Sequence, residues 1–307
     1  MKASAIIPNH RSQATLPRTL RSLEAASAGL DVEIVVSDDE TGRGLSWARN
    51  RGLDRATGDV VFFVDADDTV KPGYFRTMLD MLERTGADFA LSSFDMAPLK
   101  RDYNLSGNAQ IREAMLPAFY GYSFDDVRRW NAGGDLMARK ELGGVWRCAF
   151  RRDFLLRHGI RFDERLLMFE DGPFIAECAA HAEKVVSTPE VLYEYVPGPN
   201  GILATSMGTR RHWDYKFAAL EARIAIDRRA GGEIGRYCEA SHVFSALEML
   251  TLWRKAGLSF AEFRRGLGRY TGHPAVAEAL RRFPTSLRHP LAASAVLALR
   301  AGRIVLI

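Results

Sequence analysis

The chain has 307 residues, 47% of them apolar and 26% charged, a balance that is typical of a folded globular protein and excludes extended disorder. Its 42 Lys and Arg residues stand against 38 Asp and Glu residues, so the net charge of +4 gives no indication of nucleic-acid binding. The three cysteines are far apart and form no C-x-x-C pair, which indicates neither a zinc knuckle nor a disulfide framework and favours a reduced, cytoplasmic setting.

Strands and helices alternate over the first hundred residues. The predicted strands are Ala3–Ile7, which Pro8 stops, then Val32–Val36, Val60–Val64 and Asp88–Phe94. The predicted helices are one that starts after Thr15, one over Leu45–Ala56 and one over Pro72–Arg84. This alternation predicts a doubly wound α/β half-domain, with helices on both faces of a sheet that is largely parallel.

Carboxylates follow two neighbouring strands at the point where each strand ends. Asp38 and Asp39 come after the second strand, and a cluster of Asp65, Asp67 and Asp68 follows the third. Ligands bind at the carboxyl edge of open α/β sheets, and acids crowded there repel one another unless a cation or hydrogen-bond donors compensate. The cluster therefore predicts a metal-dependent site. The alternative interpretation is a solvated turn that caps the following helix.

The pattern weakens after Pro98, where mixed polar and aromatic sequence up to Gly144 predicts loops. The elements predicted further along are helices over Arg152–His158 and Pro173–Ala182 and edge strands over Val185–Ser187 and Val191–Val196. Beyond Arg210 the sequence is mostly helical, and we predict a domain boundary near residue 207.

Several separate motifs, in a fixed order, give the chain a resemblance to a known family. They are Ile6-Ile7-Pro8, Ile34-Val35-Val36-Ser37-Asp38-Asp39, Ala48-Arg49-Asn50-Arg51-Gly52, Asp65-Ala66-Asp67-Asp68, Gly144-Val145-Trp146 and Glu170-Asp171. With these motifs the chain resembles the family 2 glycosyltransferases of the GT-A fold over roughly residues 1–206.

The resemblance implies an α/β fold, with a doubly wound mixed sheet flanked by helices and, in this chain, a C-terminal helical extension. We expect a nucleotide-sugar-binding half at residues 1–98 and an acceptor-binding half of the same domain at residues 99–206. Residues 207–307 are then the helical C-terminal region.

The family implies an inverting transfer of a hexosyl or N-acetylhexosaminyl group from a nucleotide-diphosphate sugar, with UDP as the expected nucleotide and Mn²⁺ or Mg²⁺ as the cofactor. A divalent cation that bridges the two phosphates lowers the barrier to departure of the leaving group. The expected acceptor is a hydroxyl of a glycan or of a lipid-linked molecule, in the synthesis of cell-surface polysaccharide. The alternative is a catalytically inactive family member that acts as a carbohydrate-binding or assembly subunit.

By the resemblance, the acid cluster holds the metal and the ribose, with Asp67 and Asp68 as the metal ligands and Asp65 beside them at the nucleotide. The other residues that the family places against the nucleotide are Pro8, Asp38 and Asp39. Arg43 lies in the turn that follows, which is shorter than in many family members, and is a candidate ligand of the diphosphate or the base. Two alternatives stay open: the Asp pair as an ordinary strand-to-turn junction, and Arg43 as an exposed turn arginine.

On the acceptor side, Glu170 and Asp171 match the acidic pair of the family, whose aspartate serves as the general base. Inverting displacement needs a carboxylate that takes the proton of the acceptor hydroxyl. The alternative is that Asp171 caps the helix that follows. Trp146 is a candidate acceptor residue that stacks on a sugar ring or, alternatively, fills the core.

The helical region beyond residue 207 carries apolar stripes over Asp214–Arg229 and Ile234–Ala256, which predict packing on the catalytic domain or in a homodimer. The run Pro290–Ile307 is apolar and accompanied by arginines, but it is too short and too interrupted for a membrane span. It is either an interfacial helix on anionic lipid at the inner face of the cell membrane or a helix buried in the protein.

Overall fold

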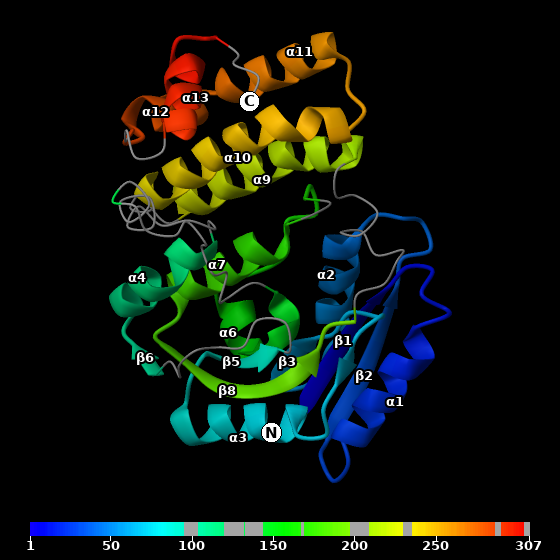
Figure 1. The fold of residues 1–307 in the computed structure, drawn as a ribbon. Helices are drawn as coiled ribbons and strands as arrows, with labels where there is room; N and C mark the ends of the chain where they lie inside the picture. Colours follow the sequence, from blue (N-terminus) through cyan, green and yellow to red (C-terminus); the bar gives the residue numbers. More distant parts are fainter. Residues whose placement is uncertain are drawn as a thin grey trace. The chain divides into compact units, whose positions relative to one another are not determined.

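The chain folds into two compact units (Figure 1). An α/β unit comprises Met1–Leu116 and Glu141–Gly198, and a helical unit comprises Pro117–Lys140 and Pro199–Ile307. The computed structural model describes residues 1–94, 104–119, 132, 144–166, 169–196, 209–229, 235–285 and 290–303.

The α/β unit is built on one mixed sheet of eight strands. The strands are β1 (Ala3–Asn9), β2 (Val32–Asp38), β3 (Val60–Phe63), β4 (Thr69–Val70), β5 (Phe89–Phe94), β6 (Asn104–Ser106), β7 (Cys148–Arg151) and β8 (Lys184–Glu194). Their order in the sheet is β2-β1-β3-β7-β5-β8-β4, and β6 pairs with β8. β1 runs parallel to β2 and β3, whereas β7 is antiparallel to both of its neighbours. The predicted mixed α/β sheet is confirmed.

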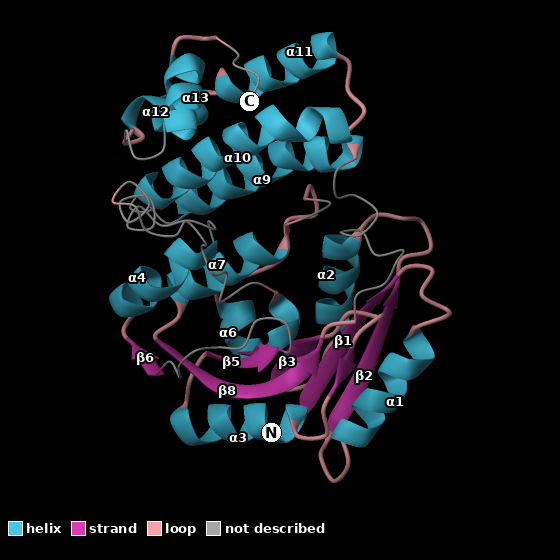
Figure 2. Ribbon diagram, viewed as in Figure 1, coloured by secondary structure: helices cyan, strands magenta, loops and turns pink. Residues whose placement is uncertain are grey.

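Helices cover both faces of this sheet (Figure 2). They are α1 (Leu16–Ala26), α2 (Leu45–Arg55), α3 (Tyr74–Thr85), α4 (Asn108–Phe119), α6 (Arg152–Arg157) and α7 (Asp171–His181), and a 3₁₀ turn, η1, spans Val145–Arg147. α1 and α3 lie on one face, and α2, α6 and α7 lie on the other. The predicted helices in this unit begin and end within a few residues of the observed ones.

Several elements differ from the prediction. Part of the segment after Pro98 that was predicted as loops forms the strand β6 and the helix α4, and the short strand β4 was not predicted. β1 continues through Pro8 to Asn9 because β3 pairs with β1 only as far as Ile6, so the N–H that Pro8 lacks has no strand to reach on that side. The two predicted edge strands after residue 184 are wrong: they form one strand, β8, which lies inside the sheet. A register shift between Leu91 and Ser93 of β5 accommodates the extra residues around Pro189.

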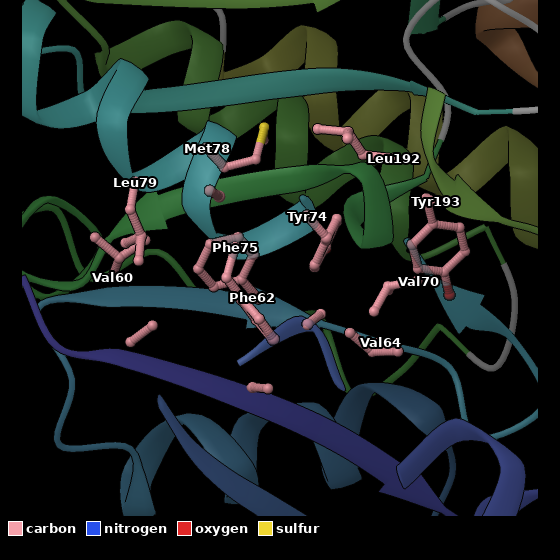
Figure 3. Packing of buried hydrophobic residues seen from close by; sticks show 14 of the residues in the cluster. Val60, Phe62, Val64, Val70, Tyr74, Phe75, Met78, Leu79, Leu192 and Tyr193 are labelled. Atoms are coloured by element: carbon pink, nitrogen blue, oxygen red, sulfur yellow. The ribbon is translucent and has the colours of Figure 1, made fainter. Parts of the chain in front are cut away.

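The core under the sheet is formed by the apolar run of β3 and the buried side of α3 (Figure 3). All four side chains of β3 are fully buried. Phe62 packs edge-on against Phe75 at 5.0 Å between ring centres and lies 5.3 Å from Tyr74. Full burial of a side chain of this size stabilises the fold by roughly 1.5–3 kcal/mol, so this cluster fixes the strand whose end carries the acids.

A close contact between α2 and β1 sets the height of α2 above the sheet. Gly52 of α2 faces Ile6, and a Cβ added at Gly52 would lie 2.2 Å from Ile6 Cγ2. Ile6 is fully buried and β-branched, so its side chain has little freedom to yield. Only glycine therefore allows α2 to sit this low on the sheet.

We expect Gly52→Ala to destabilise the α/β unit by about 1–3 kcal/mol, because the added methyl group overpacks the α2–β1 contact. Urea unfolding followed by tryptophan fluorescence measures the change. Gly172→Ala is the matched control, since Gly172 lies in α7 with nothing within 4 Å of the added Cβ. Equal stability of the two variants would show that the helix shifts without cost.

The helical unit contains α9 (Arg210–Arg229), α10 (Gly235–Lys255), α11 (Phe260–Thr271), α12 (Pro274–Arg282) and α13 (Pro290–Arg300). The predicted helical C-terminal region is thus confirmed. Ser259 and Glu262 form a capping box that starts α11. The core of this unit includes Phe263, Leu267 and Tyr270 of α11, all at most 1% exposed.

The apolar side of α13 packs into the core of the helical unit. Ala295, Val296 and Leu299 are buried there, and Arg300 donates hydrogen bonds to the backbone carbonyl groups of Leu280 and Phe283. For these residues the structure matches the second sequence-based interpretation, a helix buried in the protein. Among the described helices, none combines the length and apolar character that crossing a bilayer demands.

Candidate functional site

The carboxyl ends of β1, β2 and β3 lie at one edge of the sheet. Asn9 pairs with Asp38, and Ile6 pairs with Phe63, so the segment after β3 emerges beside the end of β1. Asp38 is exposed and accepts a hydrogen bond of 2.6 Å from the Asn9 side-chain amide. Pro8 is buried in the same strand end. The sequence-predicted nucleotide residues Pro8 and Asp38 therefore meet at this edge.

Asp39 organises the turn that leads into α2. Its carboxylate is buried and accepts the backbone N–H groups of Arg43 at 2.9 Å and Gly44 at 2.7 Å. Burial alone would raise the pKa of Asp39, but these hydrogen bonds and His10 outweigh it and the pKa is lowered. Gly44 has a φ of 109°, which a residue with a Cβ rarely adopts. The predicted contact of Asp39 with a base stays a prediction.

The Arg43 side chain is 58% exposed. Its guanidinium group lies 4.8 Å from the centre of the Trp47 ring and 3.8 Å from Glu164. Such partly solvated contacts contribute little to stability. Both interpretations of Arg43, as a phosphate or base ligand and as an exposed turn arginine, stay open.

Arg49 of α2 is the centre of the site. Only 1% of its side chain is exposed, and it donates to Asp65 at 2.9 Å, to Glu170 at 2.8 Å and to Asp171 at 2.6 Å. The guanidinium carbon also lies 5.2 Å from the centre of the Phe162 ring. One buried cation thus joins the acid cluster after β3 to the acidic pair at the start of α7.

The face of α2 around Arg49 also holds the loop that precedes the acidic pair. Asn50 exchanges two hydrogen bonds of 3.0 Å with the backbone of Phe162, and the Ser46 hydroxyl donates to the Leu166 carbonyl group at 3.0 Å. The side chains of Ser46, Arg49 and Asn50 are all buried. α2 therefore holds both the carboxylates of Glu170 and Asp171 and the loop that leads to them.

Charge is poorly balanced in this part of the site. Arg49 is the cation shared by Asp65, Glu170 and Asp171. Burial, followed by repulsion from Asp171, raises the pKa of Glu170 to about 7, although Arg49 opposes the change. Burial likewise raises the pKa of Asp171, with Arg49 opposing it and Asp65 adding to it. Carboxylates with raised pKa values in a shared site are typical of catalytic groups.

Asp171 does not act as the helix cap. Glu170 occupies the N-cap position of α7 and makes no side-chain capping hydrogen bond. The Asp171 carboxylate accepts from Arg49 and, at 3.3 Å, from the backbone N–H of Val145 in η1. These contacts come from other elements, so the capping alternative does not explain the direction of the side chain.

The three acids after β3 have different surroundings. Asp65 is 24% exposed and binds Arg49 through one oxygen. Asp68 is fully buried and accepts from the Tyr193 hydroxyl and the Val196 N–H, each at 2.7 Å. Burial and the nearby Asp65 raise the pKa of Asp68 to about 8. Asp67 is half-buried, and burial and Asp65 raise its pKa as well.

These surroundings bear on a metal ion. Among the described residues, no three acidic, histidine or cysteine side chains form a ready-made metal cage. Asp65 and Asp67 still offer carboxylate oxygens at the sheet edge, and hard oxygen ligands fit Mg²⁺ or Mn²⁺ when a diphosphate supplies others. Asp68 is fully buried beneath Tyr193 and Val196, whereas Asp67 is half-buried, so Asp67 has the more accessible carboxylate of the two predicted metal ligands.

Trp146 lies in the core, as the second of its two interpretations proposed. Its side chain stacks on Tyr193 at 4.5 Å and 26° and is 9% exposed. The Tyr74 hydroxyl donates to the Trp146 carbonyl group at 2.8 Å. A Cβ at Gly144 would lie 2.3 Å from the indole ring, so the glycine before η1 makes room for it. Trp146 therefore supports Tyr193, the partner of Asp68.

The sequence motif Ala48-Arg49-Asn50-Arg51-Gly52 contains Arg49 but did not predict its role. Its partners Glu170 and Asp171 lie 121 and 122 positions further along the chain. A local signal did exist: on α2, Arg49 shares the buried side with Ser46 and Asn50. Three polar residues on one buried side of a helix must find polar partners, which indicates a site beneath them.

Comparisons with known proteins point to the same family as the sequence motifs. The family model described as glycosyl transferase family 2 matches residues 40–140. The chain is 27% identical to the succinoglycan biosynthesis protein ExoO of Rhizobium meliloti over 218 residues, which cover 62% of this chain and 59% of ExoO. It is 28% identical to the uncharacterized glycosyltransferase EpsJ of Bacillus subtilis, over 52% of this chain and 44% of EpsJ. The chain thus spans about half the length of the curated relatives it matches.

A solved structure shows the same fold. The crystal structure of TarS 1-349 from S. aureus matches with a TM-score of 0.60 at 16% identity, over 99% of this chain and 88% of that chain. TarS 1-349 has also been solved in complex with UDP-GlcNAc. At this identity the likeness concerns the fold alone. Over residues 40–140 the chain is therefore similar to glycosyl transferase family 2, and its fold is the GT-A fold.

Proposed function

We propose that the chain is a metal-dependent, inverting glycosyltransferase that moves a sugar from a UDP-sugar to a hydroxyl group during cell-surface polysaccharide synthesis. The observation that carries this proposal is the buried Arg49, which joins Asp65 at the sheet edge to Glu170 and Asp171. The relative named for succinoglycan biosynthesis supports a polysaccharide product, and the TarS complex with UDP-GlcNAc supports a UDP-linked donor.

In this proposal Asp171 is the general base. Its side chain is 22% exposed, whereas that of Glu170 is 7% exposed, so an acceptor reaches Asp171 first. One Asp171 oxygen is held by Arg49, and the other accepts the long hydrogen bond from Val145 and no other from the described residues, which leaves a lone pair for the acceptor proton. The hydroxyl proton moves to this oxygen as the hydroxyl attacks the anomeric carbon and the nucleoside diphosphate leaves.

On the donor side, Asp65 and Asp67 would hold the divalent cation together with the diphosphate of the donor. When bound, Mn²⁺ or Mg²⁺ would neutralise negative charge on the leaving diphosphate. Asp38 and Asp39 remain the proposed residues at the base, in the nucleotide-binding half at residues 1–98. Residues 99–206 then provide the acceptor side, with a glycan or lipid-linked molecule as acceptor. We further propose that the enzyme is cytoplasmic, acts at the inner surface of the cell membrane and forms a homodimer.

Calorimetric titration with UDP, GDP and free UMP, each with and without Mn²⁺, tests the donor assignment. We expect UDP binding to strengthen about tenfold with Mn²⁺, because the ion held by Asp65 and Asp67 would offset the negative charge of the diphosphate. Asp67→Asn should remove this dependence. Asp80→Asn is the matched control, since Asp80 is an exposed aspartate on α3.

The outcomes separate the hypotheses. If no nucleotide binds at any metal concentration, the donor assignment is wrong. If UDP-sugars bind but are neither hydrolysed nor transferred to any of a panel of glycan acceptors, the catalytically inactive alternative is favoured. Binding that is equally strong in Asp67→Asn with Mn²⁺ would remove Asp67 from the metal site.

A further inference from the structure

A basic and aromatic surface lies where α10 ends and α11 begins, within the helical unit. We define the α10–α11 surface as Trp253, Arg254, Lys255, Phe260 and Arg264. Phe260, the first residue of α11, is 48% exposed. Its ring lies 6.2 Å from Trp253 and 6.0 Å from Phe263.

The core does not require an aromatic residue at position 260. The buried side of α11 is already filled by Phe263, Leu267 and Tyr270. The start of the helix is set by the capping box of Ser259 and Glu262, which places no demand on the residue between them. The aromatic ring of Phe260 is therefore about half exposed to solvent at a position where a polar residue would be compatible with the fold.

Three exposed cations lie on the same two helix ends. Arg254 lies over the Trp253 ring at 5.3 Å, Lys255 is the last residue of α10, and Arg264 lies one helical turn beyond Phe260 on the same face of α11. None of the three makes an ion pair with another residue of the described part of the chain. Glu262, the acid on α11, is taken by Arg210 and by the helix cap.

The exposed arginines of α12 offer a contrast. Arg281 pairs with Glu278, and Arg282 pairs with Glu239 and Glu278. The positive charges of α12 are therefore neutralised by acids of the same chain. Those of Arg254, Lys255 and Arg264 are not neutralised by any described residue and are available to a partner. Uncompensated cations beside an exposed aromatic ring are a surface for a negatively charged partner.

We propose that the α10–α11 surface binds the anionic face of a lipid bilayer. Cations alone would suit any polyanion, but only a bilayer offers negative headgroups with an apolar layer directly beneath, where Phe260 and the edge of Trp253 lose contact with water. One of the two sequence-based interpretations gave membrane contact to Pro290–Ile307, whose helix α13 buries Ala295, Val296 and Leu299 in the core. The proposal does not depend on the enzymatic activity.

Sedimentation with vesicles tests the proposal. We expect the full chain to pellet with vesicles of phosphatidylcholine containing roughly 30% phosphatidylglycerol, and not with pure phosphatidylcholine. The triple variant Arg254→Gln, Lys255→Gln, Arg264→Gln should bind about tenfold or more weakly, and Phe260→Ser about threefold to tenfold more weakly. Circular dichroism checks that each variant keeps its helices, and Phe260→Leu, which preserves apolar contact with Trp253, should retain binding.

Arg281→Gln with Arg282→Gln is the matched control, because these arginines are already paired. Its vesicle binding should equal that of the unmodified chain. Absence of binding to anionic vesicles overturns the proposal. So does binding that Phe260→Ser leaves unchanged and that a soluble acidic polysaccharide competes away, since the surface would then be a polyanion site.

Discussion

Asp171→Asn is expected to lower the rate of sugar transfer by about 10²–10⁴-fold while donor affinity changes by no more than about twofold. The amide keeps the shape of the side chain and can still accept from Arg49, but it cannot take a proton from the acceptor hydroxyl. Transfer measured with a radiolabelled donor, together with calorimetric donor titration, gives both quantities.

Asp153→Asn is the matched control, because Asp153 is likewise an acid in the first turn of a helix, α6, and is paired there with Arg157. If Asp171 served only its helix, the two variants would lose similar stability and neither would lose the rate of transfer. Near-normal transfer by Asp171→Asn would assign the base to another residue.

The pH dependence of transfer follows from the surroundings of Asp171. The base must be ionised, and burial raises the pKa of Asp171 despite the opposing charge of Arg49. The rate of transfer should therefore be highest at high pH and should fall as the pH drops through the raised pKa of Asp171. This fall should occur at a higher pH than the titration of an exposed aspartate. This acid limb is a property of the free enzyme when it is read from kcat/KM.

Features with a local signal were predictable from the sequence. The apolar run of β3 predicted a strand buried on both faces, and all its side chains are fully buried. The acids after β3 predicted a charged sheet edge, since parallel strands end together. The order of the motifs indicated a resemblance to the family 2 glycosyltransferases, with which the match of residues 40–140 to the family model agrees. For the strand and the charged edge, the information lies within a few residues of the feature.

Features that depend on distant partners were not predictable. Asp68 reads as one of three equivalent acids, but Tyr193, 125 residues along the chain, buries and binds it. Trp146 reads equally well as a sugar platform or a core residue, and its stacking on Tyr193 decides for the core. The two predicted strands after residue 184 form the single strand β8 because its register against β5 is irregular. An alternation of apolar and polar residues does not predict such a register shift.

Arg49→Met is expected to destabilise the α/β unit by about 3–5 kcal/mol, because it leaves three carboxylates without their shared buried cation. It should also move the acid limb of transfer to higher pH. Arg49 lowers the pKa of Asp171, so its removal raises that pKa further and the base is protonated over a wider range. Urea unfolding and a pH–rate profile measure the two effects on the same preparation.

Arg51→Met, two residues along α2 at an exposed position beside Trp47, is the matched control and should change neither quantity measurably. Arg49→Lys discriminates further, because an ammonium group keeps the charge but cannot present the planar fork that reaches three carboxylates. It should restore part of the stability and little of the rate. If Arg49→Met kept the acid limb of the unmodified chain, the guanidinium would brace the fold without tuning the base, and the link between the donor edge and Asp171 would be structural alone.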